Sequence, residues 1–244
     1  MRATTNNRES DARFFAVWEV ADFVGPVVAI DVIRAFTTSA YAFASGAKAI
    51  YLVATVGEAL EFKGRHPDAL AMGEEGGLRP DGFDFSNSPV AVAEADLRGR
   101  TLVQRTSAGT RGALAARNAA RIWCASLVCA SATARAVVAS ELGEPGYVIT
   151  GRVADRPDYG DDDLAVARFI EQARRGLTLD PERVAREVMQ SDEARRTLAL
   201  GAEHAHPSDI AYATRVDVFD FAMELQRDSE GSRLVAVGGF ASGA

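Results

Sequence analysis

Several short apolar runs of this chain lead directly into residues that could bind a charged ligand. The run at 26–30 is followed by Asp31 and Arg34, and the run at 69–72 is followed by Glu74. A carboxylate at such a place suits Mg²⁺, which prefers oxygen ligands, and a guanidinium can pair with a phosphate or a sulfonate. The alternative for Asp31 and Arg34 is a helix cap with a bridging arginine.

Two further segments place polar side chains at the start of a predicted helix. In TSAGTR (106–111), small residues let backbone amides approach an anion, although the lysine and the spacing of a Walker loop are missing. In GDDDL (160–164), Asp162 or Asp163 could reach a metal, while Asp161 suits the positive end of the helix dipole. Each segment has a plainer alternative, a Ser/Thr-capped turn for the first and a favourable helix start for the second.

Strand-like and helix-like segments alternate along the chain, which predicts one α/β domain over 1–244 with a largely parallel sheet and helices on its faces. Predicted strands lie at 13–20, 26–32, 49–54, 69–72, 101–106, 121–126 and 147–150, and closing strands lie at 216–225 and 234–237, with a hairpin around 228–232. Predicted helices lie at 37–45, 56–65, 109–117, 131–142, 161–175, 181–190, 192–200 and 206–216. Ligands of such sheets bind beyond the carboxyl ends of the strands, where the polar residues stand.

The composition excludes several classes of function. The net charge of −7 and the pI of about 5.1 argue against broad nucleic-acid binding, which needs a positive field. No apolar run approaches the roughly 18 residues of a membrane span. Residues 1–12 are polar, lack the apolar core of a signal peptide and are expected to be flexible. Two cysteines make no disulfide framework, so we expect a cytoplasmic protein, with a homodimer as one possible assembly.

Five segments, in order, resemble the 2-phosphosulfolactate phosphatase (ComB) family. They are AIDVIRAFTTSAYAFASGAKAI (29–50), GEEGGLRPDGFDFSNSP (73–89), TLVQRTSAGTRGA (101–113), ASLVCASATA (125–134) and HPSDIAYATRVDVFDFAMEL (206–225). The resemblance implies a three-layer α/β/α fold with a largely parallel or mixed sheet. It also implies Mg²⁺-dependent hydrolysis of 2-phosphosulfolactate, a step towards coenzyme M in some organisms.

The resemblance and the residue pattern together give a predicted site for a small anionic phosphorylated substrate. Catalytic roles are expected at Asp31, Arg34 and Asp163, and Mg²⁺ is expected on Asp31 with Glu74 or Asp163. Amides from Ser107 to Thr110 are expected to bind remaining charge. Further substrate contacts are implied at Thr37, Thr38, Asn87, Ser88, Thr106, Gly109, Thr110 and Ser126.

Three departures from the family pattern bear on the substrate. Ala108 stands where the family commonly has Asn, Glu75 stands where a basic residue is usual, and the segment 150–163 differs. The first two changes predict a substrate with less negative charge than phosphosulfolactate. The alternatives are therefore a phosphatase for another phosphorylated hydroxy or sugar acid, and an anion-binding module that has lost turnover.

Overall fold

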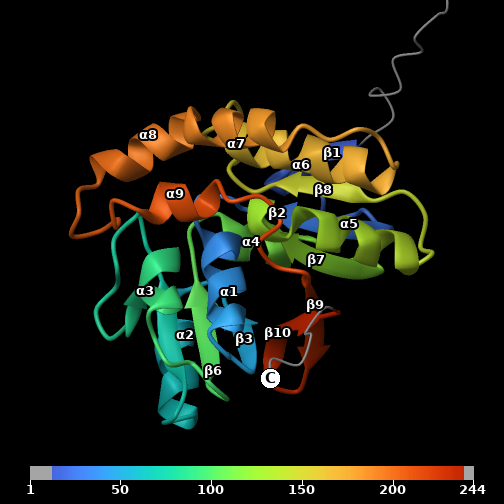
Figure 1. Ribbon diagram of the computed structural model, residues 1–244. Coiled ribbons are helices and arrows are strands. Elements are labelled where there is room, and N and C mark those ends of the chain that lie inside the picture. Colours follow the sequence, from blue (N-terminus) through green and yellow to red (C-terminus); the bar gives the residue numbers. More distant parts are fainter. Residues whose placement is uncertain (1–12, 239–244) are drawn as a thin grey trace, which may run out of the picture.

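The computed structural model describes residues 13–238, so the predicted flexible segment 1–12 lies outside the described residues. Ten strands form one sheet in the order β1-β8-β2-β7-β9-β10-β3-β6-β4-β5 (Figure 1). The strands are β1 Arg13–Ala16, β2 Pro26–Ile30, β3 Ala49–Leu52, β4 Leu70–Gly73, β5 Phe85–Ser86, β6 Thr101–Arg105, β7 Arg121–Ala125, β8 Gly146–Ile149, β9 Ala222–Asp228 and β10 Gly231–Val237. The helices are α1 Ala35–Ala44, α2 Val56–Arg65, α3 Pro89–Ala93, α4 Gly109–Ala115, α5 Ala130–Ala139, α6 Asp161–Arg174, α7 Pro181–Met189, α8 Asp192–Ala199 and α9 Asp209–Ala213, with 3-10 turns η2 Val17–Glu19 and η3 Leu127–Cys129.

The sheet consists of two parallel blocks joined by an antiparallel hairpin. One block is β1-β8-β2-β7, the other is β3-β6-β4-β5, and β9 and β10 pair antiparallel with each other and with their outer neighbours. Three successive antiparallel pairings separate the blocks, namely β7–β9, β9–β10 and β10–β3. The strands of one block therefore run in the opposite direction to the strands of the other. In Figure 1, β8 lies horizontally near the top of the view, whereas β6 runs vertically below it. The sheet is therefore strongly curled.

The curl closes around helix α1. Val27 and Ala29 of β2, Ile50 of β3 and Leu102 of β6 belong to one apolar cluster with this helix. At the end of β6, the Gln104 Nε2–H donates to the α1 backbone carbonyl of Ala35 at 3.0 Å. The carboxyl ends of β2 and β6 therefore face the same region although the two strands belong to opposite blocks.

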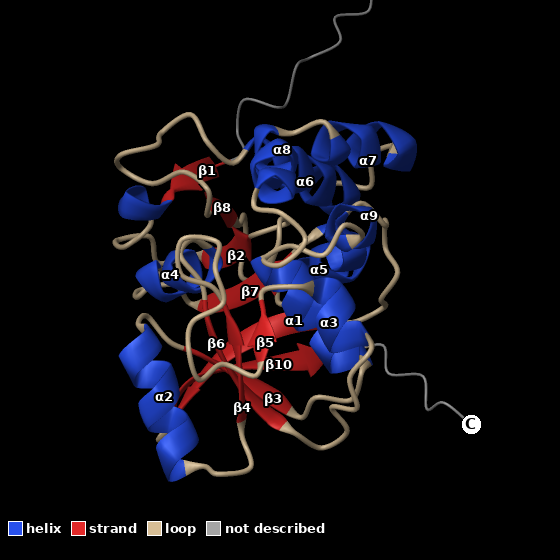
Figure 2. Cartoon of the chain, turned by 90° about the vertical axis from the view of Figure 1, so that its left-hand side faces the viewer, coloured by secondary structure: helices blue, strands red, loops and turns tan. Residues whose placement is uncertain are grey.

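Helices cover both faces of the sheet, as the three-layer prediction requires. Alternate residues of β2 enter two different cores, because side chains alternate along a strand. Val28 and Ile30 pack with α5, α6 and α7, whereas Val27 and Ala29 pack with α1 and α4. In the other block, α2 lies on one side of the strands and α1 and α3 on the other (Figure 2). The predicted mixed three-layer α/β/α fold is confirmed.

The prediction was wrong at several element boundaries. The strand predicted at 216–225 begins only at Ala222, because Asp217 has a φ of 51° and caps α5 through the amide and hydroxyl of Ser131. The strand predicted at 13–20 ends at Ala16, and the helix predicted at 206–216 shortens to α9. The short elements β5 and α3 were missed.

Two closing predictions held. The hairpin around 228–232 is present between β9 and β10. Pro181 occupies the start of α7, where its missing amide hydrogen leaves no helix bond unmade. Among the described residues, no helix combines the length and apolar character needed to cross a bilayer.

Candidate functional site

A cavity of about 440 Å³ lies beyond the carboxyl ends of β2, β4, β6 and β8. The start of α6, the loop before it and the helix α8 complete its walls. Six of the predicted site residues line it, namely Asp31, Arg34, Glu74, Asn87, Ser107 and Asp163. These six residues span 132 positions of the sequence, from Asp31 to Asp163, and the convergence of several strand ends brings them together.

Asp31 and Asp163 point toward each other across Thr150. The Thr150 hydroxyl lies 3.3 Å from Asp31 Oδ2 and 3.4 Å from Asp163 Oδ2. Backbone amides hold each carboxylate in place: Ala35 donates to Asp31 Oδ1 at 2.8 Å, and Val32 donates to Asp163 Oδ1 at 2.9 Å. The helix start at Asp163 therefore locks onto the turn that follows β2.

Burial dominates the electrostatics of this carboxylate pair. The pKa of Asp31 is raised to about 7, mainly by desolvation and also by the charges of Glu193 and Glu74, against the lowering effect of the Ala35 amide. Desolvation also raises the pKa of Asp163 and of Asp162, and in each case a neighbouring aspartate adds to the rise. Such a cluster is stabilised by a cation, because the charged forms are otherwise disfavoured.

The fit of a cation rests on this pair. Mg²⁺ in phosphate-processing sites commonly takes one or two carboxylates and completes its shell with water and substrate oxygens. Asp31 and Asp163 supply two carboxylates on either side of the Thr150 hydroxyl. The Glu74 carboxylate is bonded to the Ser107 and Gly77 amides, so Asp163 is the better candidate for the second ligand. Within residues 13–238, no three His, Cys, Asp or Glu side chains stand close enough to form a larger metal cluster.

Glu74 lines the same cavity but serves a different neighbour. Its carboxylate accepts from the Ser107 amide, from the Ser107 hydroxyl at 3.0 Å and from the Gly77 amide at 2.7 Å. Gly73 permits this tight approach of two strand ends, because its φ is 136° and a Cβ there would lie 1.8 Å from the carbonyl oxygen of Arg105. Glu74 therefore fixes the loop after β6.

The loop from Thr106 to Thr110 uses part of its own hydrogen-bonding capacity. The Thr110 amide donates to the Thr106 hydroxyl, and the Thr106 amide donates to the Thr110 hydroxyl, each at 3.0 Å. Glu74 holds the Ser107 amide. Two of the four amides expected to bind an anion are thus engaged within the protein, and the prediction for the remaining amides, those of Ala108 and Gly109, stays a prediction.

Gly109 packs against the carboxylate of Asp31. A Cβ at this position would lie 2.6 Å from Asp31 Oδ2 and 2.7 Å from the Cβ of Ala35. Gly109 thus allows the start of α4 to approach β2, which is a backbone role different from the substrate contact predicted for it.

We expect Gly109→Ala to lower kcat at least about tenfold, because Asp31 must move, and to lower the free energy of unfolding by about 1–3 kcal/mol through overpacking. Gly64→Ala is the matched control, because the helical Gly64 has no neighbouring atom within 4 Å of an added Cβ. That control should gain about 0.5–1 kcal/mol of stability. Steady-state kinetics and urea unfolding of both variants test this, and equal behaviour would contradict it.

Arg34 is anchored by a residue that the sequence reasoning missed. Its Nη1 donates to Asp209 Oδ2 at 2.8 Å and to the carbonyl oxygen of His204 at 3.2 Å, and the arginine and aspartate side chains are almost completely buried. Asp209 also accepts from the Ser88 hydroxyl at 2.6 Å and from the His206 amide. Ser88 therefore supports Arg34 through Asp209. The only sequence signal was the acidic residue in HPSD, at the start of α9.

Asn87 and Ser126 keep buried polar atoms without a partner in the described part of the chain. Asn87 is 4% exposed and lines the cavity with no donor for Oδ1, and the Oγ of the fully buried Ser126 is also unpartnered. Buried polar atoms are normally bonded, so an unpartnered one beside a cavity is suited to a ligand. The Asn87 side chain is therefore available to a ligand, and the substrate contact predicted for it stays a prediction.

Thr37 and Thr38 are fully buried on α1 and do not line the cavity. Their hydroxyls donate to the backbone carbonyls of Val32 and Arg34. Glu75, one of the departures, pairs with Arg105 at 3.0 Å and lies outside the cavity lining, with 63% of its side chain exposed. Ala108 does line the cavity. The structure thus removes one of the two reasons for expecting a less charged substrate.

The outer wall comes from segments without a strong sequence signal. Arg196 of α8 pairs with Glu193 at 3.0 Å and lies over the ring of Tyr159 at 3.5 Å. Arg156, Tyr159, Glu193 and Arg196 all line the cavity. Helical i,i+3 charge pairs are common on solvated surfaces, which is why the sequence could not single them out.

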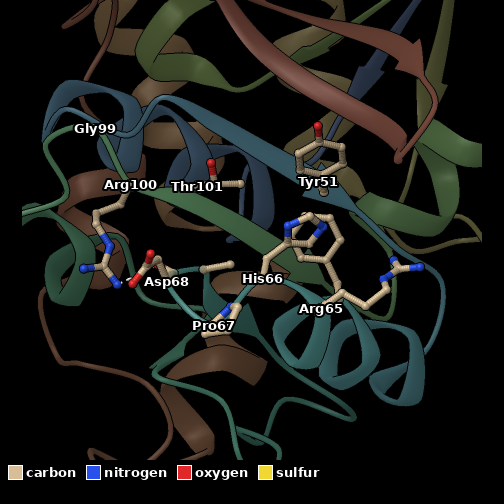
Figure 3. Close-up of a pocket in the computed structure, with 10 residues that line it drawn as sticks. Tyr51, Arg65, His66, Pro67, Asp68, Gly99, Arg100 and Thr101 are labelled. Atoms are coloured by element: carbon tan, nitrogen blue, oxygen red, sulfur yellow. Dashed lines mark hydrogen bonds between the residues drawn. The ribbon is translucent and has the colours of Figure 1, made fainter.

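A second cavity of about 380 Å³ lies at the amino ends of β4 and β6. Figure 3 shows Arg65, His66 and Arg100 around it. None of the predicted site residues lines it, and His66 is bonded to Glu230 at 3.0 Å. The strand-end cavity is therefore the better candidate for the chemistry.

Comparisons with known proteins identify the family of this chain. The sequence profile of the 2-phosphosulpholactate phosphatase family matches residues 18–228. The chain belongs to this family. A probable 2-phosphosulfolactate phosphatase of Bacillus subtilis is 36% identical over 204 residues, which is 83% of this chain and 88% of the relative. A protein of the same description from Caldicellulosiruptor saccharolyticus is 37% identical over 222 residues, with 82% of this chain and 88% of the relative covered.

Membership of the 2-phosphosulfolactate phosphatase family confirms the resemblance stated from the five segments. The profile match includes every residue of the candidate site from Asp31 to Asp209. A further relative, a probable 2-phosphosulfolactate phosphatase of Thermus thermophilus, is 35% identical over 185 residues, which is 75% of this chain and 72% of the relative.

Proposed function

We propose that this chain hydrolyses 2-phosphosulfolactate to sulfolactate and phosphate, with Mg²⁺ held by Asp31 and Asp163. The observation that carries the proposal is the pair of buried carboxylates that converge on the Thr150 hydroxyl inside the cavity. The names of the relatives support a phosphate monoester as the substrate class.

A cation held by Asp31 and Asp163 would supply positive charge to offset that of the phosphate, and the rest of the chemistry falls to the side chains. Phosphoryl transfer depends mainly on positioning and on offsetting charge. Arg34 lines the cavity from the floor, and its pairing with Asp209 fixes the direction of its guanidinium. A guanidinium held in this way is organised to bind a phosphate before the reaction begins.

The two aspartates have a second role in the proposal. An attacking water needs an acceptor close to the phosphorus, and Asp31 and Asp163 supply carboxylate oxygens at the same point of the cavity. A carboxylate that attacks the phosphorus itself, to form a phosphorylated aspartate, is the alternative use of the same residues.

Trapping with hydroxylamine, or mass spectrometry of a quenched reaction, separates these two routes.

Asn87 Oδ1, which is buried and unpartnered, could accept a hydrogen bond from a bound water or a substrate group.

One observation favours another phosphorylated acid as the substrate. Ala108 lines the cavity where relatives are expected to carry an amide side chain, so the pocket has lost one donor and one acceptor. A screen of phosphate release with several phosphorylated hydroxy acids tests this against 2-phosphosulfolactate.

The metal proposal is tested by phosphate release with and without Mg²⁺. We expect activity to need Mg²⁺, to fall in excess chelator and to return when Mg²⁺ is added back. Thermal unfolding with and without Mg²⁺ gives an independent readout, because a ligand that binds only the folded state raises its stability. Full activity in chelator, with no metal in the protein by elemental analysis, would remove Mg²⁺ from the mechanism.

A further inference from the structure

Four arginines line the strand-end cavity, and their pairing differs. Arg34 pairs with Asp209, Arg156 with Asp155, and Arg196 with Asp192 and Glu193. Among residues 13–238, Arg111 has no carboxylate within 4 Å and no hydrogen-bond or aromatic partner for its guanidinium. An unpaired guanidinium on the wall of a substrate cavity is available to an anion from outside the protein.

The position of Arg111 is fixed by the same packing that fixes Asp31. Arg111 lies in the first turn of α4, two residues after Gly109, which is in contact with Asp31. The backbone of Arg111 is therefore held rigidly beside the carboxylate pair, while its side chain is exposed at the mouth of the cavity. Arg34, by contrast, is only 4% exposed. The cavity thus has a deep guanidinium and an outer one.

The chemistry of the proposed substrate matches two guanidiniums at different depths. In 2-phosphosulfolactate, one carbon carries both the phosphate ester and the carboxylate, and the next carbon carries the sulfonate. When the phosphate lies at Asp31, Asp163 and Arg34, the sulfonate is the anionic group that extends farthest toward the mouth. A sulfonate offers three acceptor oxygens, which suit the forked donors of an arginine.

We propose that Arg111 is a specificity-determining residue that binds the sulfonate of the substrate. The inference rests on the proposed function, since it needs the phosphate at the carboxylate pair. Ala108, three residues before Arg111, also lines the cavity and has only a methyl side chain. The other two outer arginines are less suited, because Arg196 is engaged with α8 carboxylates and with the Tyr159 ring, and Arg156 is engaged with Asp155 and with the same ring.

The test compares two esters that differ only in this group, 2-phosphosulfolactate and 2-phospholactate. The quantity measured is the ratio of their kcat/KM values. Arg111→Gln should lower the ratio about tenfold, the scale of one charged hydrogen-bonding contact at a partly exposed site. Arg111→Lys should lower it less, because charge remains while the fork is lost.

Arg117→Gln is the matched control, because Arg117 is an exposed arginine just beyond the end of the same helix and does not line the cavity. It should leave the ratio unchanged. Circular dichroism confirms folding of each variant, and Arg111→Lys decides the matter if Arg111→Gln fails to fold. A ratio within about twofold of wild type in the folded Arg111 variant would overturn the assignment. Equal losses on both esters would also overturn it, since they would place Arg111 on a shared group.

Failure of the proposed function gives a different result. If the wild type releases phosphate from neither ester, the function is wrong, and the Arg111 assignment is then decided by calorimetric binding of sulfolactate and lactate. Sulfolactate binding that is tighter than lactate binding in the wild type, and that loses this advantage in Arg111→Gln, supports the assignment. The same preference in both proteins, or none in either, contradicts it.

Discussion

Replacing Asp31 with asparagine is expected to lower phosphate release at least about a hundredfold, the scale of losing one strong electrostatic contributor at a reacting phosphate. The amide keeps the shape of the carboxylate and an oxygen that can accept from the Ala35 amide, which Asp31 Oδ1 now holds at 2.8 Å. What it removes is the charge that faces Asp163 across Thr150. Phosphate release should therefore fall, whereas the free energy of unfolding should not.

The effect on stability has a definite sign. Burial raises the pKa of Asp31 from 3.8 to about 7. Between these values the folded chain binds more protons than the unfolded chain at this residue, so its contribution to stability falls as the pH rises through that window. Asparagine does not titrate. Without divalent cations at pH 8, Asp31→Asn should be at least as stable as the wild type.

Urea unfolding at pH 5 and pH 8 in chelator, together with kinetics in Mg²⁺, measures both effects. The stability difference between the two pH values should shrink in the variant. A variant that unfolds more readily at pH 8 but keeps wild-type turnover per folded molecule would make Asp31 a structural cap.

The second large effect is expected at Asp209. Asp209→Ala should lower the free energy of unfolding by about 3–5 kcal/mol, because it leaves the buried Arg34 without its counter-charge. The Ser88 hydroxyl and the His206 amide lose their acceptor as well. Since Arg34 lines the cavity, turnover of the remaining folded protein should also fall.

A surface ion pair gives the matched control. Asp220 pairs with Arg135, and the side chains are 75% and 62% exposed. Asp220→Ala should change the free energy of unfolding by less than about 1 kcal/mol, because exposed pairs contribute little. Urea unfolding of the two variants gives the comparison. A similar decrease in the free energy of unfolding of both variants would show that the buried Arg34–Asp209 pair contributes no more to stability than an exposed pair.

The sequence was sufficient for the parts of the site that follow strands. Asp31 and Glu74 come directly after strands, and Ser107 follows β6 after one intervening residue. Parallel strands bring such positions together within each block, and the curl of the sheet brings the two blocks together. Asp163 was found as part of an acidic helix start. These predictions depend on local patterns, which a single sequence contains.

The rest of the site depends on contacts between distant segments. Nothing near Asp209 in the chain indicates that it will meet Arg34, 175 residues earlier. Thr37 and Thr38 look equally suited to a ligand and to α1, and only the direction of the helix decides that their hydroxyls bond to backbone carbonyls of the turn before it. Arg111 differs from other exposed arginines in that it lines the cavity without an ion-pair partner, which a sequence cannot show.

The strand order also escaped prediction. Continuous apolar runs such as β2 indicate buried strands but do not specify neighbours. The sequence predicts the β9–β10 hairpin from its turn, yet not its place between the two parallel blocks. That placement is decided by long-range pairing, which local propensity does not encode.

The central position of the β9–β10 hairpin has a consequence for how the sheet folds during synthesis of the chain. β9 and β10, at 222–237, leave the ribosome after every strand they join, yet they form the seam between β7 and β3. Until they arrive, each block has an unpaired inner edge, and such edges can associate with other chains. A chain stalled before residue 222 lacks the seam that fixes Asp31 and Asp163 relative to Glu74 and Ser107. Assembly of the sheet is therefore completed by one short ribbon that is synthesised after all the strands it joins.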